Sequence, residues 1–186
     1  MKRVVVTGLG TVNPLGHNLT DTWAALSAGQ SGIRIIEHFD TADFAVRFAG
    51  TLPDFNPEPV VSGKEARRID LFIQYALVAA AEAMTHSGLE GQFDPDRAGV
   101  AIGSGIGGLS TIEQNVRQLV SGGPKKVSPF LVPGSVVNMA SGNVAIRYNL
   151  RGPNFSIATA CTTGAHNIGF AARSIACGDA DVMLAG

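Results

Sequence analysis

Glycine-rich turns at the ends of short apolar segments most constrain how this 186-residue chain can fold. One β-branched segment ends at Gly8-Leu-Gly10, and another leads into the run Gly103-Ser-Gly-Ile-Gly-Gly108. Such segments are typical of buried strands that turn sharply into the next element. Two later segments have the same character. The predicted strands are residues 3–7, 99–103, 155–160 and 181–185.

Helical segments alternate with these strands. The clearest is an Ala-rich segment that Asp70 can cap and Gly88 can end. Ser110 and Glu113 form a capping-box pattern at the start of another. We expect helices at residues 20–29, 70–87, 109–123, 133–148 and 161–177, and irregular chain with short strands between 30 and 67. Strand and helix alternation predicts an α/β fold with a largely parallel sheet.

The charge balance excludes a general binder of polyanions. Lysine and arginine number 14 and aspartate and glutamate 15, a net charge of −1, so no nucleic-acid partner is expected. Charged residues are only 16% of the chain, well below the usual share, which suggests that a partner or further domain buries some of its surface. No apolar run approaches the 18 residues of a membrane span, and no signal peptide is apparent. Two cysteines make no disulfide scaffold, and a reducing cytoplasm fits them.

Cys161 is the candidate nucleophile. It stands at a predicted strand-to-helix junction, within ATACTTGAHNIG. The positive end of the following helix would favour its thiolate, and free backbone N–H groups would face an oxyanion. The alternative is that Cys161 is a small buried side chain, the commonest environment of a free cysteine. Cys177 lies near the end of the helix and is expected to be structural.

No base accompanies this thiol. His166 lies five residues after Cys161 on the same predicted helix, about 140° around it, and so faces away from the sulfur. No histidine or acidic spacing fits a metal site. Residues 103–108 match the G-x-G-x-x-G pattern of dinucleotide-binding turns, but no aspartate or glutamate occurs from residue 114 to 178 to hold a ribose. Nucleotide binding is therefore disfavoured.

Basic residues concentrate in two short segments. Lys64, Arg67 and Arg68 precede the Ala-rich helix, and Lys125 and Lys126 lie in a Gly-Pro turn. Concentrated cations in a nearly neutral protein favour docking of an acidic macromolecule or a phosphate-bearing ligand. For any one of these residues, an ordinary solvated position is the simpler alternative.

The chain resembles the N-terminal half of the β-ketoacyl-[acyl-carrier-protein] synthases, in particular the type II elongating class. The resemblance extends over all 186 residues and rests on the segments RVVVTGLGTVNPLG, GQSGI, KEARRIDLFIQYAL, GSGIGGL, SPFLVPGSVVNMASG, LRGPNFSIATACTTGAHNIG and GDADVMLAG. It implies the thiolase-like fold, with helices on both faces of the sheet and a buried helix after Cys161. It also implies that residues 1–186 form one incomplete domain.

The resemblance implies roles for single residues. Cys161 matches the acyl-accepting nucleophile, and its N–H matches one oxyanion donor. Ile106 matches the residue that gates the acyl pocket, and Leu131 occupies a site near the pocket of the dimer mate. The positions that match basic residues receiving the carrier protein are Lys64, Arg67, Arg68, Lys125 and Lys126. The two catalytic histidines and the lysine of the family have no counterpart in these 186 residues.

The implied reaction is a decarboxylative Claisen condensation without metal or other cofactor, in fatty acid elongation in the cytoplasm. The expected partners are an acyl carrier protein and a second copy of the chain, with residues 132–145, Phe155 and Ile157 buried in the homodimer. We expect residues 1–186 alone to be inactive. Two alternatives stay open. A non-catalytic subunit like a chain-length factor would lack the active cysteine, and a cysteine thioester hydrolase would need a nearby base.

Overall fold

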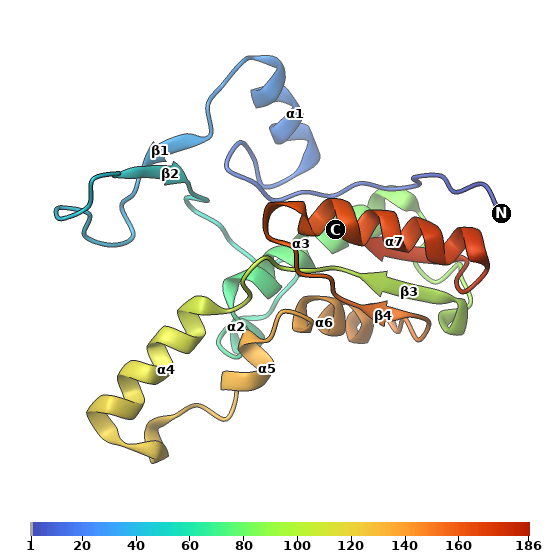
Figure 1. Ribbon diagram of the computed structural model, residues 1–186. Helices are drawn as coiled ribbons and strands as arrows, with labels where there is room; N and C mark the ends of the chain where they lie inside the picture. The colour runs from blue at the N-terminus through green and yellow to red at the C-terminus, as the bar shows by residue number, and fades with distance from the viewer. Residues whose placement is uncertain (1) are drawn as a thin grey trace.

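The structure is a computed structural model that describes residues 2–186. Figure 1 shows its elements from the N- to the C-terminus. The α-helices are α1 (Leu19–Ser27), α2 (Gly63–Ala66), α3 (Leu71–Ser87), α4 (Leu109–Gly122), α5 (Leu131–Ser135), α6 (Met139–Tyr148) and α7 (Thr163–Cys177). The 3-10 turns are η1 (Pro95–Arg97), η2 (Pro124–Lys126) and η3 (Ala160–Thr162). The strands are β1 (Ile33–Ile35), β2 (Phe48–Gly50), β3 (Ala98–Ala101), β4 (Asn154–Phe155) and β5 (Val182–Ala185).

The predicted parallel sheet is confirmed. Its order is β4-β3-β5, and β3 pairs in parallel with both neighbours, with Val100 opposite Asn154 and Leu184. All four residues of β3 are buried, as expected for a central strand covered on both faces. The strands β1 and β2 form a separate antiparallel hairpin. This hairpin agrees with the short strands expected between residues 30 and 67.

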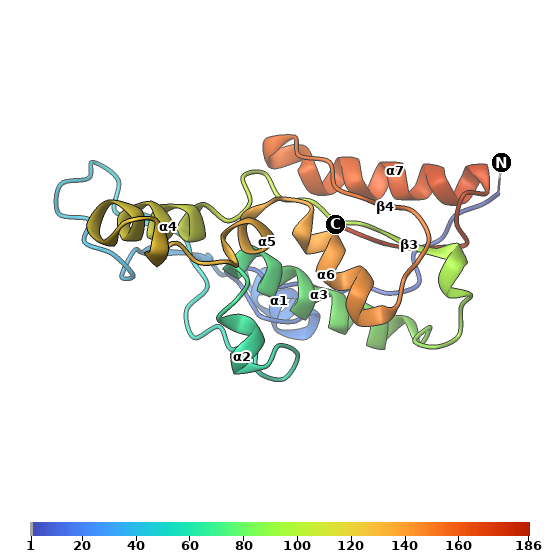
Figure 2. The same ribbon diagram turned by 90° about the horizontal axis from the view of Figure 1, so that it is seen from below.

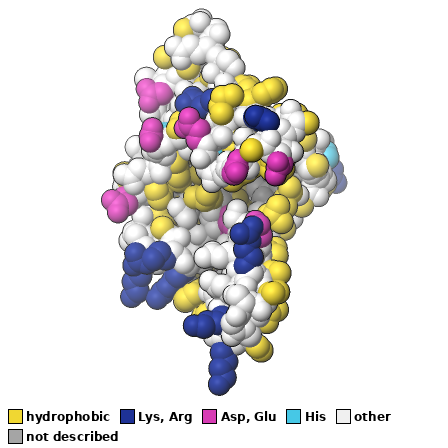
Figure 3. Space-filling model, turned by 90° about the vertical axis from the view of Figure 1, so that its left-hand side faces the viewer, with side chains coloured by type: hydrophobic (Ala, Val, Ile, Leu, Met, Phe, Trp, Pro, Cys, Tyr) yellow, Lys and Arg dark blue, Asp and Glu magenta, His cyan; other side chains and the backbone are white. Residues whose placement is uncertain are grey.

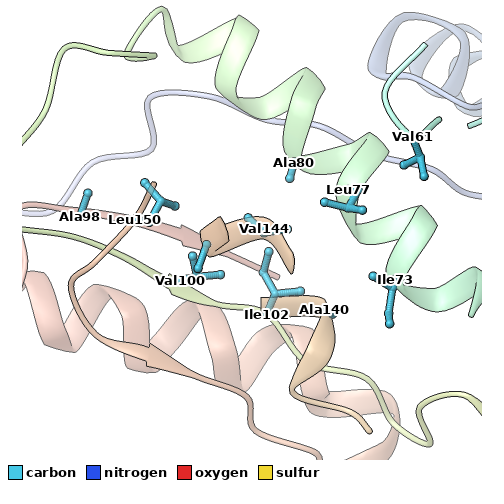
Figure 4. Close-up of a cluster of buried hydrophobic side chains, with 11 residues drawn as sticks. Val61, Ile73, Leu77, Ala80, Ala98, Val100, Ile102, Ala140, Val144 and Leu150 are labelled. Atoms are coloured by element: carbon cyan, nitrogen blue, oxygen red, sulfur yellow. The ribbon is translucent and has the colours of Figure 1, made fainter. Parts of the chain in front are cut away.

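Helices cover both faces of the sheet. Figure 2 shows α7 on one side of the strands and α3 and α6 on the other, which agrees with the contacts between these elements. The main core lies under α3 and α6, where their side chains and those of β3 point toward one another (Figure 4). Ile73 and Leu77, four residues apart on α3, are fully buried there with Val100 and Val144. The helix α4 and the β1–β2 hairpin extend away from this body (Figure 1).

The prediction of a strand at residues 3–7 is wrong. The segment is extended, but Val5 and Val6 are exposed, and within residues 2–186 it pairs with no strand. An apolar cavity of about 600 Å³ lies between this segment and β5, α3 and α7. Side chains of α3 hold the chain further along, because Glu82 Oε2 accepts the Thr11 N–H at 2.9 Å. A β-branched run alone therefore does not make a strand where no edge lies within hydrogen-bonding reach.

The single helix predicted over residues 133–148 is also wrong, because the structure divides it into α5 and α6. The break follows Ser135, where the backbone of Val136 is extended with ψ near 135°. The carbonyl of Ser135 instead accepts the Gly108 N–H at 2.8 Å, and that of Gly134 accepts the Asp70 N–H at 3.3 Å. Contacts with other parts of the chain thus end the helix where the local sequence shows no stop.

The helix α7 follows Cys161 as expected, but in this chain it is not buried all round. Thr163, Asn167 and Ala171 are buried, and this i, i+4 spacing places them on one stripe against the sheet. Ile168 and Phe170, which lie between these positions along the helix, are each about half exposed. The prediction of a buried helix is therefore correct for one face only.

No helix within residues 2–186 is both long enough and apolar enough to cross a bilayer.

Candidate functional site

Two turns meet at the carboxyl edge of the sheet. One, residues 103–108, joins β3 to α4, and the other, residues 156–162, joins β4 to α7. Because β3 and β4 are parallel neighbours, both turns leave the sheet at the same edge. A Cβ on Gly105 would lie 3.4 Å from the Ala160 carbonyl oxygen, so the two backbones are in contact. The glycines of the first turn therefore allow the close approach of the second.

Cys161 projects from this second turn. It lies in η3, one residue before the N-cap of α7, and its thiol is free and exposed. Within residues 2–186 the Cys161 N–H donates to no backbone or side-chain acceptor. Ala160 has the left-handed φ of 52°, which strains a residue with a Cβ. A strained backbone, an exposed thiol and a free N–H at a helix start suit a nucleophile beside an oxyanion.

Asn167 holds the second turn in shape. Its side chain accepts the Ile157 N–H at 3.0 Å and donates to the carbonyls of Ile157 and Thr163 at 3.0 and 2.9 Å. Thr163 Oγ1 accepts the Thr159 N–H at 2.9 Å. No motif in the sequence points to Asn167 or Thr163. The signal that was available is their i, i+4 spacing on the inner stripe of a helix rich in small residues.

Within residues 2–186, His166 makes no hydrogen bond to Cys161, which agrees with the helical spacing. Its Nδ1 lies 2.8 Å from Thr159 Oγ1. Elsewhere, His86 Nδ1 accepts the Leu9 N–H at 3.2 Å, and His17 packs edge-on to Phe55. Among the described residues no group of three or more metal-ligating side chains occurs. The thiol thus has no histidine partner in residues 2–186.

Ile106 lies in the glycine turn that contacts the thiol turn, and α5 packs against the end of that glycine turn. The Ile106 side chain is 72% exposed, in the glycine turn that contacts Ala160. The following Gly107 has a φ of 82° and donates to Ser104 Oγ at 2.9 Å. The start of α4 packs closely on α5, because a Cβ on Gly108 would lie 2.6 Å from Ser135 Cα. Half-buried Leu131 is the first residue of this α5.

A carboxylate from another helix caps α4. The predicted capping box is wrong, because the N-cap is Gly108 and makes no side-chain hydrogen bond. Asp70 Oδ2 accepts both the N–H and the hydroxyl of Thr111, at 2.9 and 2.7 Å. Asp70 is itself buried. Burial raises the pKa of Tyr75, and the negative charge of Asp70 raises it further. One carboxylate therefore fixes the start of α4 against the start of α3.

The basic residues lie exposed on the side of the molecule that carries α2 and α4. Lys64, Arg67 and Arg68 are exposed in and after α2, and Lys125 and Lys126 are exposed in η2. Figure 3 shows lysine and arginine side chains gathered over the lower part of this face. We call these five residues the basic surface.

A polar groove of about 510 Å³ lies beside Arg67 and Arg68 of the basic surface. It is lined by Arg67 and Arg68 on one side and by α4 with Ser128 and Phe130 on the other. The Arg68 guanidinium lies 4.9 Å from the centre of the Phe130 ring, which holds the walls together. Asp70 also lines the groove, and a Cβ on Gly108 would approach Asp70 Cβ to 3.1 Å. The groove thus adjoins the glycine turn beside Cys161.

These features define an α/β protein with an exposed thiol where a strand passes into a helix, and a basic surface near it. Comparison with known proteins identifies the family. Residues 1–186 match the family model described as beta-ketoacyl synthase, N-terminal domain. The chain belongs to the β-ketoacyl synthase family.

Relatives and solved structures agree with this membership. The chain is 56% identical over 186 residues to the 3-oxoacyl-[acyl-carrier-protein] synthase 2 of Vibrio cholerae serotype O1, and 53% identical to that of Coxiella burnetii. It covers 45% of each of these relatives. The whole chain also matches a solved structure titled as a type II PKS acyl-carrier protein in complex with its ketosynthase. The TM-score is 0.85, the identity is 29%, and the match covers 50% of the chain in that structure. The thiolase-like α/β fold of these ketosynthases is therefore the fold of this chain.

Proposed function

We propose that this chain supplies the acyl-accepting thiol of a β-ketoacyl-[acyl-carrier-protein] synthase that elongates fatty acids. The observation that carries the proposal is the position of Cys161, exposed at the start of α7 with a free backbone N–H beside it. Cysteine is both a good nucleophile and a good leaving group, so it suits the exchange of one thioester for another. Ile106, at the edge of the same site, would limit the space open to the acyl chain.

The reaction has two stages. First, Cys161 Sγ attacks the carbonyl of an acyl-carrier thioester; the carrier sulfur leaves with a proton, and an acyl-cysteine remains. Then a malonyl-carrier thioester loses carbon dioxide, and the resulting enolate attacks the acyl carbonyl. The bond to Cys161 breaks and the β-ketoacyl-carrier is released. The Cys161 N–H would stabilise the negative oxygen of each tetrahedral intermediate.

The decarboxylation needs groups that residues 2–186 do not bring to Cys161. No histidine in this range forms a hydrogen bond with the thiol. His166, the nearest in sequence, lies within hydrogen-bonding distance of Thr159 instead. We propose that residues 1–186 form the N-terminal part of a larger catalytic domain and do not condense acyl chains alone. The chain spans 45% of the length of its curated relatives, which supports this division.

An acyl-transfer experiment on the full-length protein tests the role of Cys161. Cleavage after Arg151 and Arg173 places Cys161 and Cys177 on different peptides. After incubation with an acyl-carrier thioester, we expect the acyl mass on the Cys161 peptide, unchanged in Cys177→Ala and absent in Cys161→Ala. Acylation of Cys177 instead would overturn the assignment. With malonyl-carrier added, a ketoacyl product supports the synthase, free acid a hydrolase, and no turnover a non-catalytic subunit.

We further propose that two copies of the chain associate. Supporting observations are that β4 is an edge strand and that the exposed apolar residues of α4 include Ile112, Val116 and Val120. The segment 132–145 contributes less than the sequence suggested, because Val144 and two alanines within it are buried in the chain's own core. Light scattering of the full-length protein should show a dimer at micromolar concentration.

The two free cysteines support a cytoplasmic location.

The same proposal includes an acyl carrier protein as the docking partner. The exposed basic surface and the groove beside the glycine turn support this partner, since rim charges steer an acidic protein to its site. Leu131 would contribute to the acyl pocket from α5.

A further inference from the structure

One acidic residue lies among the cations of α2, and its carboxylate is turned toward the body of the molecule. Glu65 stands in α2 between Lys64 and Arg67, yet its carboxylate accepts two hydrogen bonds from Arg147 Nη2, at 2.9 and 3.0 Å. The side chains of Glu65 and Arg147 are only 37% and 26% exposed. The neighbouring cations are all exposed. The Glu65 charge is therefore paired with Arg147, whereas the charges of the neighbouring cations face the solvent.

Arg147 ties α2 to the core of the molecule. It lies in the last turn of α6, which packs on α3 and β3. Its Nη1 donates to the carbonyl of Val60, in the loop that leads into α2. A four-residue helix such as α2 has little stability of its own, so its position depends on such tertiary contacts. Gln74 provides a second tie, because its Nε2 donates to the Ala66 and Ile69 carbonyls at 3.1 Å.

We propose that Glu65 and Arg147 are positioning residues for carrier docking, which rests on the carrier partner proposed above. Their ion pair holds α2 so that Lys64, Arg67 and Arg68 face the carrier together. The pair also neutralises a carboxylate that would otherwise stand unpaired among these cations. Position and charge make opposite predictions for the loss of the Glu65 carboxylate, and this difference can be measured.

The decisive variant is Glu65→Gln in the full-length protein. It makes the basic surface more positive by one charge, so electrostatic attraction alone would tighten binding of an acidic acyl carrier protein. If Glu65 positions α2, binding should weaken instead, by roughly fivefold in Kd, through loss of the ion pair. Calorimetry with the carrier measures this Kd. Labelling of Cys161 by iodoacetamide should not change, because the thiol turn does not depend on α2.

Glu113→Gln is the matched control. Glu113 lies on α4 in an exposed pair with Arg117, at i and i+4, so the variant makes the same change of charge without a tie to the core. We expect its carrier Kd to change by less than about twofold. Tighter binding by Glu65→Gln, or equal effects of the two variants, would overturn the positioning role.

Two further variants guard against misfolding, and a third change separates the positioning proposal from the docking proposal. Glu65→Asp keeps the charge but shortens the side chain, and should also weaken docking; Arg147→Lys should retain part of the affinity. If both bind like the wild type, positioning is refuted. Reversal of Lys125 and Lys126 to Glu tests docking itself and should raise the carrier KM about tenfold. If that reversal has no effect, the docking proposal fails, and the positioning role fails with it.

Discussion

The two turns at the carboxyl edge of the sheet solve the same problem in different ways. The turn after β3 has four glycines in six residues and makes its close contacts by lacking side chains. The turn after β4 keeps its side chains and accepts a left-handed Ala160. Buried Asn167 holds it by hydrogen bonds to Ile157 on both backbone groups. The first turn provides space and the second provides a fixed thiol, so a reactive group and room for its substrate come from neighbouring strands.

The comparison predicts that the glycine turn tolerates no side chain at Gly103. A Cβ there would overlap the Ile157 carbonyl oxygen and would lie 2.6 Å from Thr163 Cγ2. We expect Gly103→Ala to lower the free energy of unfolding by about 3 kcal/mol, since backbone and packed side chain must both move. Urea denaturation measures the change.

Gly169→Ala is the control for this prediction. Gly169 lies inside α7, and an added Cβ would meet nothing within 4 Å. Because alanine favours a helix interior, this variant should gain roughly 0.5 to 1 kcal/mol. A loss of less than about 1 kcal/mol for Gly103→Ala would show that the glycine turn can open without cost to the core.

The second turn should depend on a side chain where the first depends on glycine. Asn167→Ala leaves the N–H and carbonyl of Ile157 without their partners inside the protein, and should cost about 2 kcal/mol. The counterpart in the first turn is Ser104→Ala, which removes a single hydrogen bond to Gly107 and should cost about 0.5 kcal/mol. Equal costs in urea denaturation would remove the distinction between the two turns.

The strain at Ala160 can be relieved directly. Glycine adopts a φ of 52° without a Cβ clash, so Ala160→Gly should stabilise the protein, by up to about 1 kcal/mol after the entropy of the unfolded glycine is counted. The shift of the thermal midpoint measures it. A destabilised variant would mean that the Ala160 Cβ makes contacts worth more than the strain.

The smallest expected change in stability lies at the opposite edge of the sheet, where the strands begin. Asp181, just before β5, accepts hydrogen bonds from Arg97 and Lys2, which lower its pKa to about 2. The lowered pKa means that this carboxylate contributes stability above pH 4, and the contribution is lost as the pH falls toward 2. The wild type should therefore lose slightly more thermal stability than Asp181→Asn between pH 4 and 2. Parallel pH profiles of the two proteins would contradict the prediction.

Much of the fold could be predicted because its signals are local. The helix Leu71–Ser87 was predicted almost to the residue, because left-handed Gly88 ends it. The expected cap by Asp70 was wrong, since the Asp70 carboxylate binds Thr111 of α4 instead. The exposure of the basic residues and the absence of a bond from His166 to Cys161 followed from helical spacing and turn chemistry. The unpaired state of residues 3–7 could not be predicted, because a strand also requires a partner edge, which the local sequence does not show.

The sequence by itself determined the alternation of helices with the strands of the parallel sheet, the glycine joints and the thiol at the start of a helix. Only the tertiary structure decided that Asp70 caps α4, that Asn167 shapes the thiol turn, and that Glu65 turns from the basic surface toward Arg147. The physical reason is the distance along the chain. Propensity and capping act within one helical turn, whereas Asp70 lies 41 residues from Thr111 and Glu65 lies 82 from Arg147. Such partners become visible only when the packed layers bring them together.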